Sequence, residues 1–394
     1  MGRIAGGKRF LRKFSCALIS LGLISATGCH AQNWPLWNQY STHFVDAQGR
    51  VVDHNAGDRS TSESESYAMF FALVANDRIR FDKLLSWTEN NLAQGDLTQH
   101  LPAWSWGKAP DGSWRVLDEN SASDADLWMA YSLCEAGRLW GVDRYSKLGI
   151  TIANRIAREE LTLIPNLGTT LLPGRQGFHP SPSVWFVNPS YMAPFQLQYF
   201  ARQDPSAPWA QVLASLPSVL HTSGGFAMDW MQVSSDHGLE PSAPPGVVAA
   251  LAQGQQPPVP VGSYDAIRVY LWAGLSNSQT PHIAEIRKSI PGMATYLASG
   301  HITPPQQVGP EGQVIQDAAP PGFSAAVIPY LHALNRKEEE KSQAARLEAT
   351  LDPQRGLYGQ QGMYYDQNLA LFEDGFMSGL YSFERDGRLK VRWK

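Results

Sequence analysis

Two kinds of helical segment alternate along this chain of 394 residues, and the alternation limits the possible folds more than any other feature. One kind is apolar on nearly every side, as in residues 63–75 and 265–273. The other kind has an apolar stripe and a charged face, as in residues 81–92 and 145–160. A helix that is apolar all round has to be buried, so the pattern predicts buried helices ringed by amphipathic ones, as in an α/α barrel. A large irregular helical bundle fits the same periodicity.

Helical periodicity covers most of the remaining chain. The further predicted helices span residues 124–140, 189–202, 209–220, 282–298, 323–334, 336–350 and 364–372. Short strands are expected only at 114–117 and 390–393, and the regions 241–260 and 302–321, rich in Pro and Gly, are expected to be surface insertions. No linker divides residues 32–394, so we expect a single domain there.

The N-terminus, residues 1–31, has the features of a signal peptide. Five basic residues lie between Arg3 and Lys13, and a short apolar stretch follows at 14–26. Ala31 is suited to cleavage before the next residue, and the apolar stretch is shorter than the roughly 20 residues that span a bilayer. Cys29 ends a loose lipobox, so lipoprotein processing is the alternative. Either route predicts an exported protein, periplasmic or secreted.

Charge and cysteine content exclude several kinds of partner and of stabilising bond. Removing residues 1–31 removes five Lys or Arg and no Asp or Glu, which leaves 27 basic and 36 acidic side chains. An acidic body argues against nucleic acid and against anionic membrane surfaces as partners. Of the three cysteines only Cys134 lies beyond the predicted signal, so no intrachain disulfide is expected there.

Three of the apolar helices are predicted to begin with acids, namely Glu63, Asp124 and Asp265. Taken singly, each acid has a structural explanation, because the helix dipole favours a carboxylate in the first turn by about 0.3–1 kcal/mol. If the three helices run the same way inside a barrel, however, their N-termini gather at one end. Carboxylates that crowd together raise at least one pKa, and an acid kept protonated beside others kept ionised is what acid–base hydrolysis of a glycosidic bond needs.

Helix capping is the competing explanation for some of these side chains. Ser62 with Glu65, and Ser60 with Glu63, both have the S-x-x-E spacing of a capping box. One such box leaves the other glutamate unexplained. Ser123 is a candidate N-cap for the helix that carries Asp124.

Tryptophans outside the predicted helices are a second indication that the protein binds sugars. Trp104 and Trp106 lie in a polar, loop-like stretch, where they could stack against the apolar faces of sugar rings. Trp128, Trp140 and Trp272 lie within predicted helices, and ordinary core packing explains them better.

These residues resemble glycoside hydrolase family eight, and within it the endoglucanases encoded with bacterial cellulose synthases. The matching stretches are TSESESYAMFFALVANDR (61–78), FDKLLSWTENNLAQG (81–95), LPAWSWGK (101–108), NSASDADLWMAYSLCEAGRLW (120–140), NPSYMAP (188–194), SYDAIRVYLW (263–272), GFSAAVIPYL (322–331) and YYDQNLALF (364–372). The resemblance implies an all-α (α/α)6 barrel with minor short strands, formed by one catalytic domain over 32–394. It also implies endo-1,4-β-glucanase activity on cellulose or β-glucan, with inversion.

The resemblance also implies roles for the three acids. Glu63 matches the proton donor and Asp265 the general base that activates water. Asp124 matches an aspartate that is either a nucleophile or the residue that holds the sugar, and inversion favours the second role because it forms no covalent intermediate.

Five further positions match residues that bind substrate. Tyr191 and Tyr264 match tyrosines at the cleavage subsite, and Arg268 matches an arginine beside the base. Trp104 and Trp106 match stacking platforms further along the cleft.

Several questions stay open at this level. Position 65 is Glu where related sequences often have Gln, and it could either face the cleft and raise the pKa of Glu63 or cap the helix. The same fold could act on chitosan, mixed-linkage glucan or xylan, or the protein could be a non-catalytic glucan-binding component of a cellulose export complex. We expect no metal or cofactor, since the ten histidines are scattered, and we expect a monomer with a functional link to a cellulose synthase.

Overall fold

Helix α2 (Ser62–Val74) has the all-round apolar character that the sequence predicts, and every one of its residues except Glu63 is buried. We analysed it in a computed structural model of the chain that describes residues 2, 33–251 and 255–394. The predicted signal peptide and the alternative lipidation site at Cys29 lie outside the described residues. Within them, no helix combines the length and the apolar character needed to cross a membrane.

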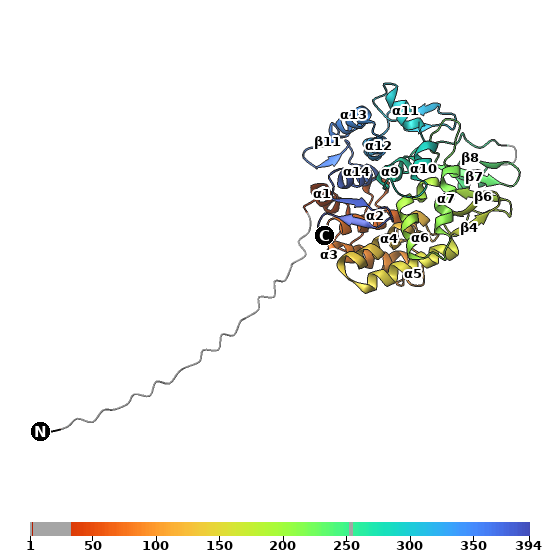
Figure 1. Cartoon of the computed structure of the whole chain (residues 1–394). Coiled ribbons are helices and arrows are strands. Elements are labelled where there is room, and N and C mark those ends of the chain that lie inside the picture. The colour runs from red at the N-terminus through yellow and green to blue at the C-terminus, as the bar shows by residue number, and fades with distance from the viewer. Residues whose placement is uncertain (1, 3–32, 252–254) are drawn as a thin grey trace. The chain divides into compact units, whose positions relative to one another are not determined.

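Six buried helices form a closed ring in the described part of the chain. They are α2, α4 (Ser123–Trp140), α6 (Pro194–Gln203), α9 (Ala266–Leu275), α12 (Pro321–Ala333) and α14 (Tyr364–Met377). Each contacts the next in this order, and α14 contacts α2, so the ring closes (Figure 1). The buried helices are therefore the inner wall of a barrel.

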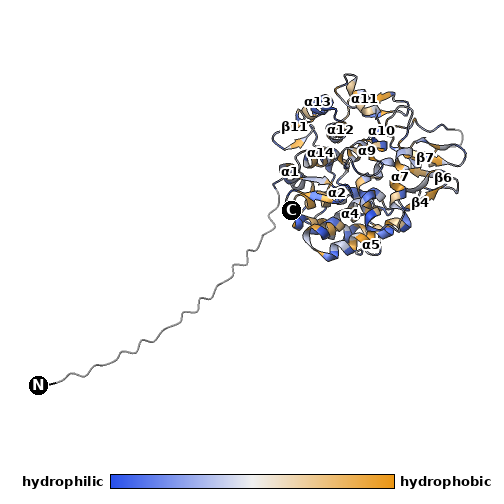
Figure 2. Ribbon diagram, viewed as in Figure 1, coloured by the Kyte–Doolittle hydropathy of each residue, from blue (hydrophilic) through white to orange (hydrophobic). Residues whose placement is uncertain are grey.

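Amphipathic helices surround this ring. They are α1 (Pro35–Phe44), α3 (Arg78–Leu92), α5 (Asp143–Glu159), α7 (Trp209–Val219), α10 (Ile283–Ser289), α11 (Gly292–Ala298) and α13 (Lys337–Glu348). Most follow an inner helix directly and pack against it, and α1 packs against α14 (Figure 1). Helix α5 shows the pattern well, because it buries Tyr145, Ile152 and Ile156 on one stripe and carries both hydrophilic and hydrophobic colours in Figure 2. The predicted (α/α)6 barrel is confirmed.

Some predicted helix boundaries were wrong, and proline explains most of the differences. The helix predicted over 282–298 is broken between α10 and α11, where Pro291 lacks the N–H that a continuous helix needs. The helix predicted over 189–202 begins only at Pro194, after a short 3₁₀ turn (Pro189–Tyr191). Helix α1 was not predicted, and the region 241–260 contains a short helix, α8 (Pro245–Ala249).

The loops pair into small antiparallel sheets more often than the sequence predicts. Strands were found at both predicted positions, as β3 (Trp114–Asp118) and β14 (Leu389–Val391). The others are β1 (Ser60–Thr61), β2 (Ser105–Lys108), β4 (Leu161–Ile164), β5 (Gly168–Leu171), β6 (Val184–Val187), β7 (Trp230–Ser234), β8 (Gly238–Ser242), β9 (Gln307–Val308), β10 (Val314–Gln316), β11 (Leu351–Asp352), β12 (Leu357–Tyr358) and β13 (Tyr381–Phe383). The sheet β1–β2–β3 matters most for function, because it joins the start of α2 to the tryptophan-rich loop.

Aromatic side chains fill the centre of the barrel. Phe372 packs with Trp128 and with Trp272 at ring-centroid distances of 5.0 Å, and Trp128 packs with Phe70 at 4.8 Å. All four rings are buried, and burying one such side chain stabilises the fold by about 1.5–3 kcal/mol. The predicted core positions of Trp128 and Trp272 are confirmed, and the half-buried Trp140 packs against Phe81 in the outer layer.

Glu65 neither lines the candidate site nor caps the helix. Its Oε1 atom accepts a hydrogen bond of 2.8 Å from the backbone N–H of Val51, which ties the N-terminal segment to α2. The side chain is completely buried, and this burial raises the pKa of Glu65 well above its ordinary value. Burial therefore favours the protonated form of Glu65 in the folded protein.

The buried acid makes stability depend on pH. Because the folded state binds the proton of Glu65 more tightly than the unfolded state, this contribution is full below the unfolded pKa and is lost as pH rises. We expect Glu65→Gln, which keeps the acceptor and cannot ionise, to be more stable than the wild type at pH 8, with a smaller difference at pH 5. Urea unfolding at both values measures this effect. Glu65→Ala should instead cost about 1–3 kcal/mol at either pH, because the Val51 N–H loses its partner. A Gln variant less stable than the wild type at pH 8 would contradict the assignment.

Candidate active site

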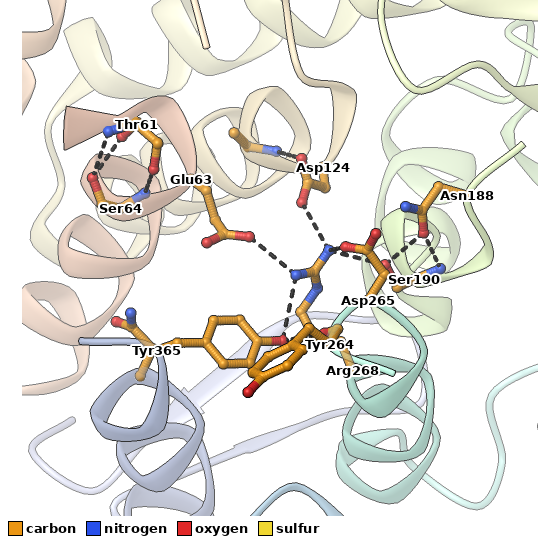
Figure 3. A network of polar contacts seen from close by, with 12 residues as sticks. Thr61, Glu63, Ser64, Asp124, Asn188, Ser190, Tyr264, Asp265, Arg268 and Tyr365 are labelled. Atoms are coloured by element: carbon orange, nitrogen blue, oxygen red, sulfur yellow. Dashed lines mark hydrogen bonds and ion pairs between the residues drawn. The ribbon is translucent and has the colours of Figure 1, made fainter. Parts of the chain in front are cut away.

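The N-terminal ends of α2, α4 and α9 meet at one end of the barrel, around the guanidinium of Arg268 (Figure 3). One terminal nitrogen, Nη1, lies 3.2 Å from Glu63 Oε2. The other, Nη2, lies 2.8 Å from Asp265 Oδ1 and 3.6 Å from Asp124 Oδ2. The structure therefore brings together the three acids that the sequence singled out, from positions far apart in the chain.

Glu63 reaches the site because other residues cap its helix. Thr61 Oγ1 accepts from the backbone N–H of Ser64, and Ser64 Oγ accepts from the N–H of Thr61, each at 3.1 Å. The two capping boxes expected at Ser62–Glu65 and Ser60–Glu63 were therefore wrong, because the box lies one residue away from each. With the helix terminus satisfied by Thr61 and Ser64, the Glu63 carboxylate is free to face Arg268.

Strand pairing places a tryptophan beside Glu63. Thr61 pairs with Ser105 in the β1–β2 ladder, and the N–H of Ser62 donates to the carbonyl of Trp104 at 3.1 Å. The N–H of Trp104 in turn donates to the carbonyl of Asn120 at 2.8 Å. One short segment therefore links the start of α2 to the loop before α4.

Asp124 and Asp265 occupy different positions at their helix starts. Asp124 is in the first turn of α4, where its Oδ1 accepts from the N–H of Ala125 at 2.8 Å. The N-cap of this helix is Ala122 and not Ser123, whose hydroxyl makes no cap hydrogen bond. Asp265 is itself the N-cap residue of α9, but its side chain does not cap the helix and instead contacts Arg268.

Arg268 is held from two sides. Ser190 Oγ accepts from Nη2 at 3.0 Å and donates to Asn188 Oδ1 at 2.7 Å, and both of these residues are buried. On the other side the hydroxyl of Tyr365 accepts from Nη1 at 3.5 Å and donates to the carbonyl of Tyr264. The guanidinium therefore cannot turn without breaking its bonds to Glu63 on α2, to Ser190 in the 3₁₀ turn and to Tyr365 on α14 (Figure 3).

The geometry limits the separation of Glu63 and Asp265. Their oxygens contact the two terminal nitrogens of one planar guanidinium, so they lie no more than about 8 Å apart. An acid and a base that act on opposite sides of one bond, with a water between, have carboxyl groups roughly 6.5–9.5 Å apart. This upper limit allows the separation of such a pair, and it equally allows the roughly 5–5.5 Å of a retaining pair.

Burial shifts the protonation of two of the acids. It raises the pKa of Glu63, an effect that the Arg268 charge opposes and the Asp265 charge reinforces. Burial likewise raises the pKa of Asp124 to about 7, against the effect of Arg268. Three carboxylates share one cation here, and the site therefore holds a proton close to neutral pH.

A pocket of about 170 Å³ opens beside these acids. Trp104 and Tyr191 line it together with the three carboxylates and Arg268, and the Tyr191 ring lies 5.8 Å from the Arg268 Cζ atom. Larger pockets of 370, 360, 300 and 220 Å³ lie elsewhere in the described part of the chain. The first two have no carboxylate among their lining residues, and the last two are lined by Glu119 and by Glu338 with Glu339, none of which contacts a buried arginine such as Arg268 among the described residues.

The remaining predicted substrate-binding residues lie outside this pocket. The Trp106 ring stacks with Trp114 at 5.3 Å, and the Arg50 guanidinium lies over it at 4.5 Å. The Tyr264 ring is 43% exposed and packs edge-on against Tyr365 at 5.7 Å, next to the site.

Sequence reasoning missed three residues of the site. Arg59 lines the pocket and lowers the pKa of Glu63 through its charge. Ser190 and Tyr365 bind Arg268. Ser190 and Tyr365 lie within the stretches NPSYMAP and YYDQNLALF, but no local spacing marks them as partners of a distant arginine.

Comparisons with known proteins agree on one family. The family model described as "Glycosyl hydrolases family 8" matches residues 9–372. The chain is 43% identical over 364 residues to an endoglucanase of Xanthomonas axonopodis pv. citri (strain 306), covering 92% of this chain and 90% of the relative. It is 38% identical over 380 residues to an endoglucanase of Escherichia coli (strain K12), covering 95% and 96%. The solved structure of an endo-1,4-D-glucanase from Vibrio fischeri ES114 is similar with a TM-score of 0.80 and 36% identity, covering 92% of this chain and 99% of that one.

The charge of Arg59 is one of the influences that lower the pKa of Glu63. We expect Arg59→Met to raise the pKa of Glu63, because the variant removes a cation that favours the ionised carboxylate. The pKa can be followed by NMR titration of the protein with ¹³C-labelled glutamate side chains.

A matched control is Arg115→Met, which removes an exposed arginine of β3 that pairs with Asp111. It should leave the titration of Glu63 unchanged. An unchanged or lowered pKa of Glu63 in the Arg59 variant would refute the electrostatic role of Arg59.

Proposed function

The chain belongs to glycosyl hydrolase family 8 and is a glycoside hydrolase, and we propose that it cleaves internal β-1,4-glucosidic bonds of cellulose or a related β-glucan with inversion. The observation that carries this proposal is the gathering of Glu63, Asp124 and Asp265 around Arg268. The endoglucanase relatives, up to 43% identical over most of the chain, support the choice of substrate.

Glu63 is the proton donor in this mechanism. Burial raises its pKa, which favours the protonated carboxyl group that delivers its proton to the departing glycosidic oxygen as the C1–O bond breaks. Arg268 lies 3.2 Å from the same carboxyl group and stabilises the carboxylate that remains after the transfer.

Asp265 is the general base. Its carboxylate lies 2.8 Å from Nη2 of Arg268 and accepts a proton from a water molecule as that oxygen attacks C1 from the opposite face. After one turnover Asp265 carries a proton and Glu63 has lost one, and exchange with solvent restores both.

Asp124 holds the sugar ring at the cleavage point. Its carboxyl group is almost completely buried and its Oδ1 already accepts from Ala125, so the group has little freedom to move towards C1. Trp104 and Tyr191 supply aromatic surface for sugar rings in the same pocket. Trp106 and Tyr264 are not among the residues that line this pocket, although Tyr264 lies next to it against Tyr365.

Export and cellulose production are a further part of the proposal, and they rest on the sequence. The signal-like residues 1–31 support a periplasmic or secreted enzyme, and the resemblance to endoglucanases encoded with cellulose synthases supports an accessory role in making cellulose. We propose that the enzyme acts as a monomer with a functional link to the synthase. Cell fractionation, and cellulose output in a strain without the enzyme, test these points.

Loss of either proposed catalytic carboxylate should abolish most activity. We expect Glu63→Gln and Asp265→Asn each to lower kcat on carboxymethylcellulose by about 10²–10⁴-fold, while binding of cello-oligosaccharides is retained. Reducing-sugar release and calorimetric binding measure the two quantities. Wild-type kcat in Glu63→Gln would overturn the assignment and favour a non-catalytic glucan-binding role.

The stereochemistry of the product tests the roles of Asp265 and Asp124. ¹H NMR of fresh product from a soluble cello-oligosaccharide should show the α-anomer first, because water attacks the face opposite the leaving group. A β-anomer would mean retention and would make Asp124 the nucleophile.

A substrate panel tests the specificity. Cellulose and carboxymethylcellulose should be cleaved faster than chitosan, mixed-linkage glucan or xylan. Failure to cleave cellulose with activity on one of the others would replace the proposed substrate and keep the reaction class.

A further inference from the structure

Asp229 caps the helix of the proposed base from a distant part of the chain. Its Oδ1 atom accepts hydrogen bonds of 2.8 Å from the backbone N–H groups of both Ser263 and Ala266. These two residues flank Asp265, which is at the N-cap position of α9 but makes no cap hydrogen bond with its own side chain. A carboxylate from the loop before β7 therefore binds the first N–H group of α9 and the backbone just before the helix, while the N–H groups of Ile267 and Arg268 donate to the carbonyls of Ser263 and Asp265.

Three backbone contacts fix the segment that carries Asp229. The N–H of Asp229 donates to the carbonyl of Val261 at 2.9 Å, and the N–H of Ala227 donates to the hydroxyl of Tyr270 at 3.0 Å. At Gly262 the chains approach so closely that a Cβ atom would lie 2.1 Å from the carbonyl oxygen of Ala227. Glycine is required there, and the carboxylate of Asp229 is held on a rigid support.

Asp229 and Asp265 also interact electrostatically. Burial and the charge of Asp265 raise the pKa of Asp229 to about 7, while the two backbone hydrogen bonds oppose the rise.

We propose that Asp229 is a positioning residue for catalysis, which aims Asp265 at the attacking water by holding the backbone on both sides of it. The inference rests on the proposed role of Asp265 as general base. The bonds to Ser263 and Ala266 fix the backbone from which the Asp265 side chain extends to Arg268. Without them this short segment could shift and carry the Asp265 carboxylate away from the water.

The test compares two substitutions of Asp229 on soluble cello-oligosaccharides. Asp229→Ala removes the acceptor and should lower kcat by about 10–100-fold with KM within about twofold, because a small misplacement of a catalytic group slows chemistry more than binding. Asp229→Asn keeps an oxygen acceptor and should restore kcat to within about threefold of the wild type.

Asp77→Ala is the matched control. Asp77 caps the outer helix α3 by accepting from the N–H of Arg80 at 3.1 Å, and it follows the C-terminal end of α2, whereas Glu63 lies at the N-terminal end of that helix. Its loss should lower the unfolding midpoint and leave kcat unchanged. If Asp229→Ala proves unstable, Asp229→Ser, with a shorter acceptor, should fold and show an intermediate kcat, while tryptophan fluorescence shows that it binds cello-oligosaccharide.

Two outcomes would overturn the inference. One is a kcat for Asp229→Ala that equals the wild-type value, and the other is equal impairment of the Ala and Asn variants. Asp265→Asn separates this claim from the proposed function. Wild-type activity in Asp265→Asn would refute the role of Asp265 as general base, and with it the proposed mechanism. An inactive Asp265→Asn together with a fully active Asp229→Ala would refute only the role of Asp229.

Discussion

The rest of the site depends on one buried cation among three acids. Arg268 has a side chain only 4% exposed, and it is the shared partner of Glu63, Asp124 and Asp265. Removing charges from water costs several kcal/mol per ion, so a buried guanidinium needs partners for its donors. Besides the acids, Ser190 and Tyr365 accept hydrogen bonds from its two terminal nitrogens. Its Nε atom is buried and has no hydrogen-bond partner within the described part of the chain, so packing against the barrel wall has to hold that side of the group.

Two opposing effects act on the acids, and their sizes decide the protonation state. The N-termini of three inner helices favour negative charge by about 0.3–1 kcal/mol each at exposed sites. Burial acts in the opposite direction and is the larger effect, because the pKa of Asp124 rises to about 7 despite its place in a first helical turn and beside Arg268. The same architecture that gathers the acids therefore also keeps a proton among them, which a polar surface cleft with the same residues would not do.

The sequence allowed the ring of inner helices to be predicted, because a helix that is apolar on all sides has to be buried. It also allowed the meeting of the three acids to be predicted, because inner helices that run in the same direction have their N-termini at the same end of the barrel. It did not allow the supports of Arg268 to be predicted. Ser190 lies in a 3₁₀ turn and Tyr365 on α14, and each acquires its role only when the barrel closes. Helix α1 escaped notice because its residues are poor helix formers, although Trp37, Tyr40 and Phe44 are buried at helical spacing.

The error about capping shows how the fold separates stability from chemistry. A carboxylate that caps a helix accepts backbone N–H bonds, and such bonds lower its pKa. An acid catalyst needs the opposite, so a capping Glu63 would have been a poor proton donor. The chain avoids this conflict by giving the cap of α2 to the hydroxyls of Thr61 and Ser64, which do not titrate. At α9 the first helical N–H group is instead bonded by a carboxylate, that of Asp229, which interacts electrostatically with Asp265. Burial raises the pKa of Asp229 to about 7, so this acid can hold a proton beside Asp265 close to neutral pH.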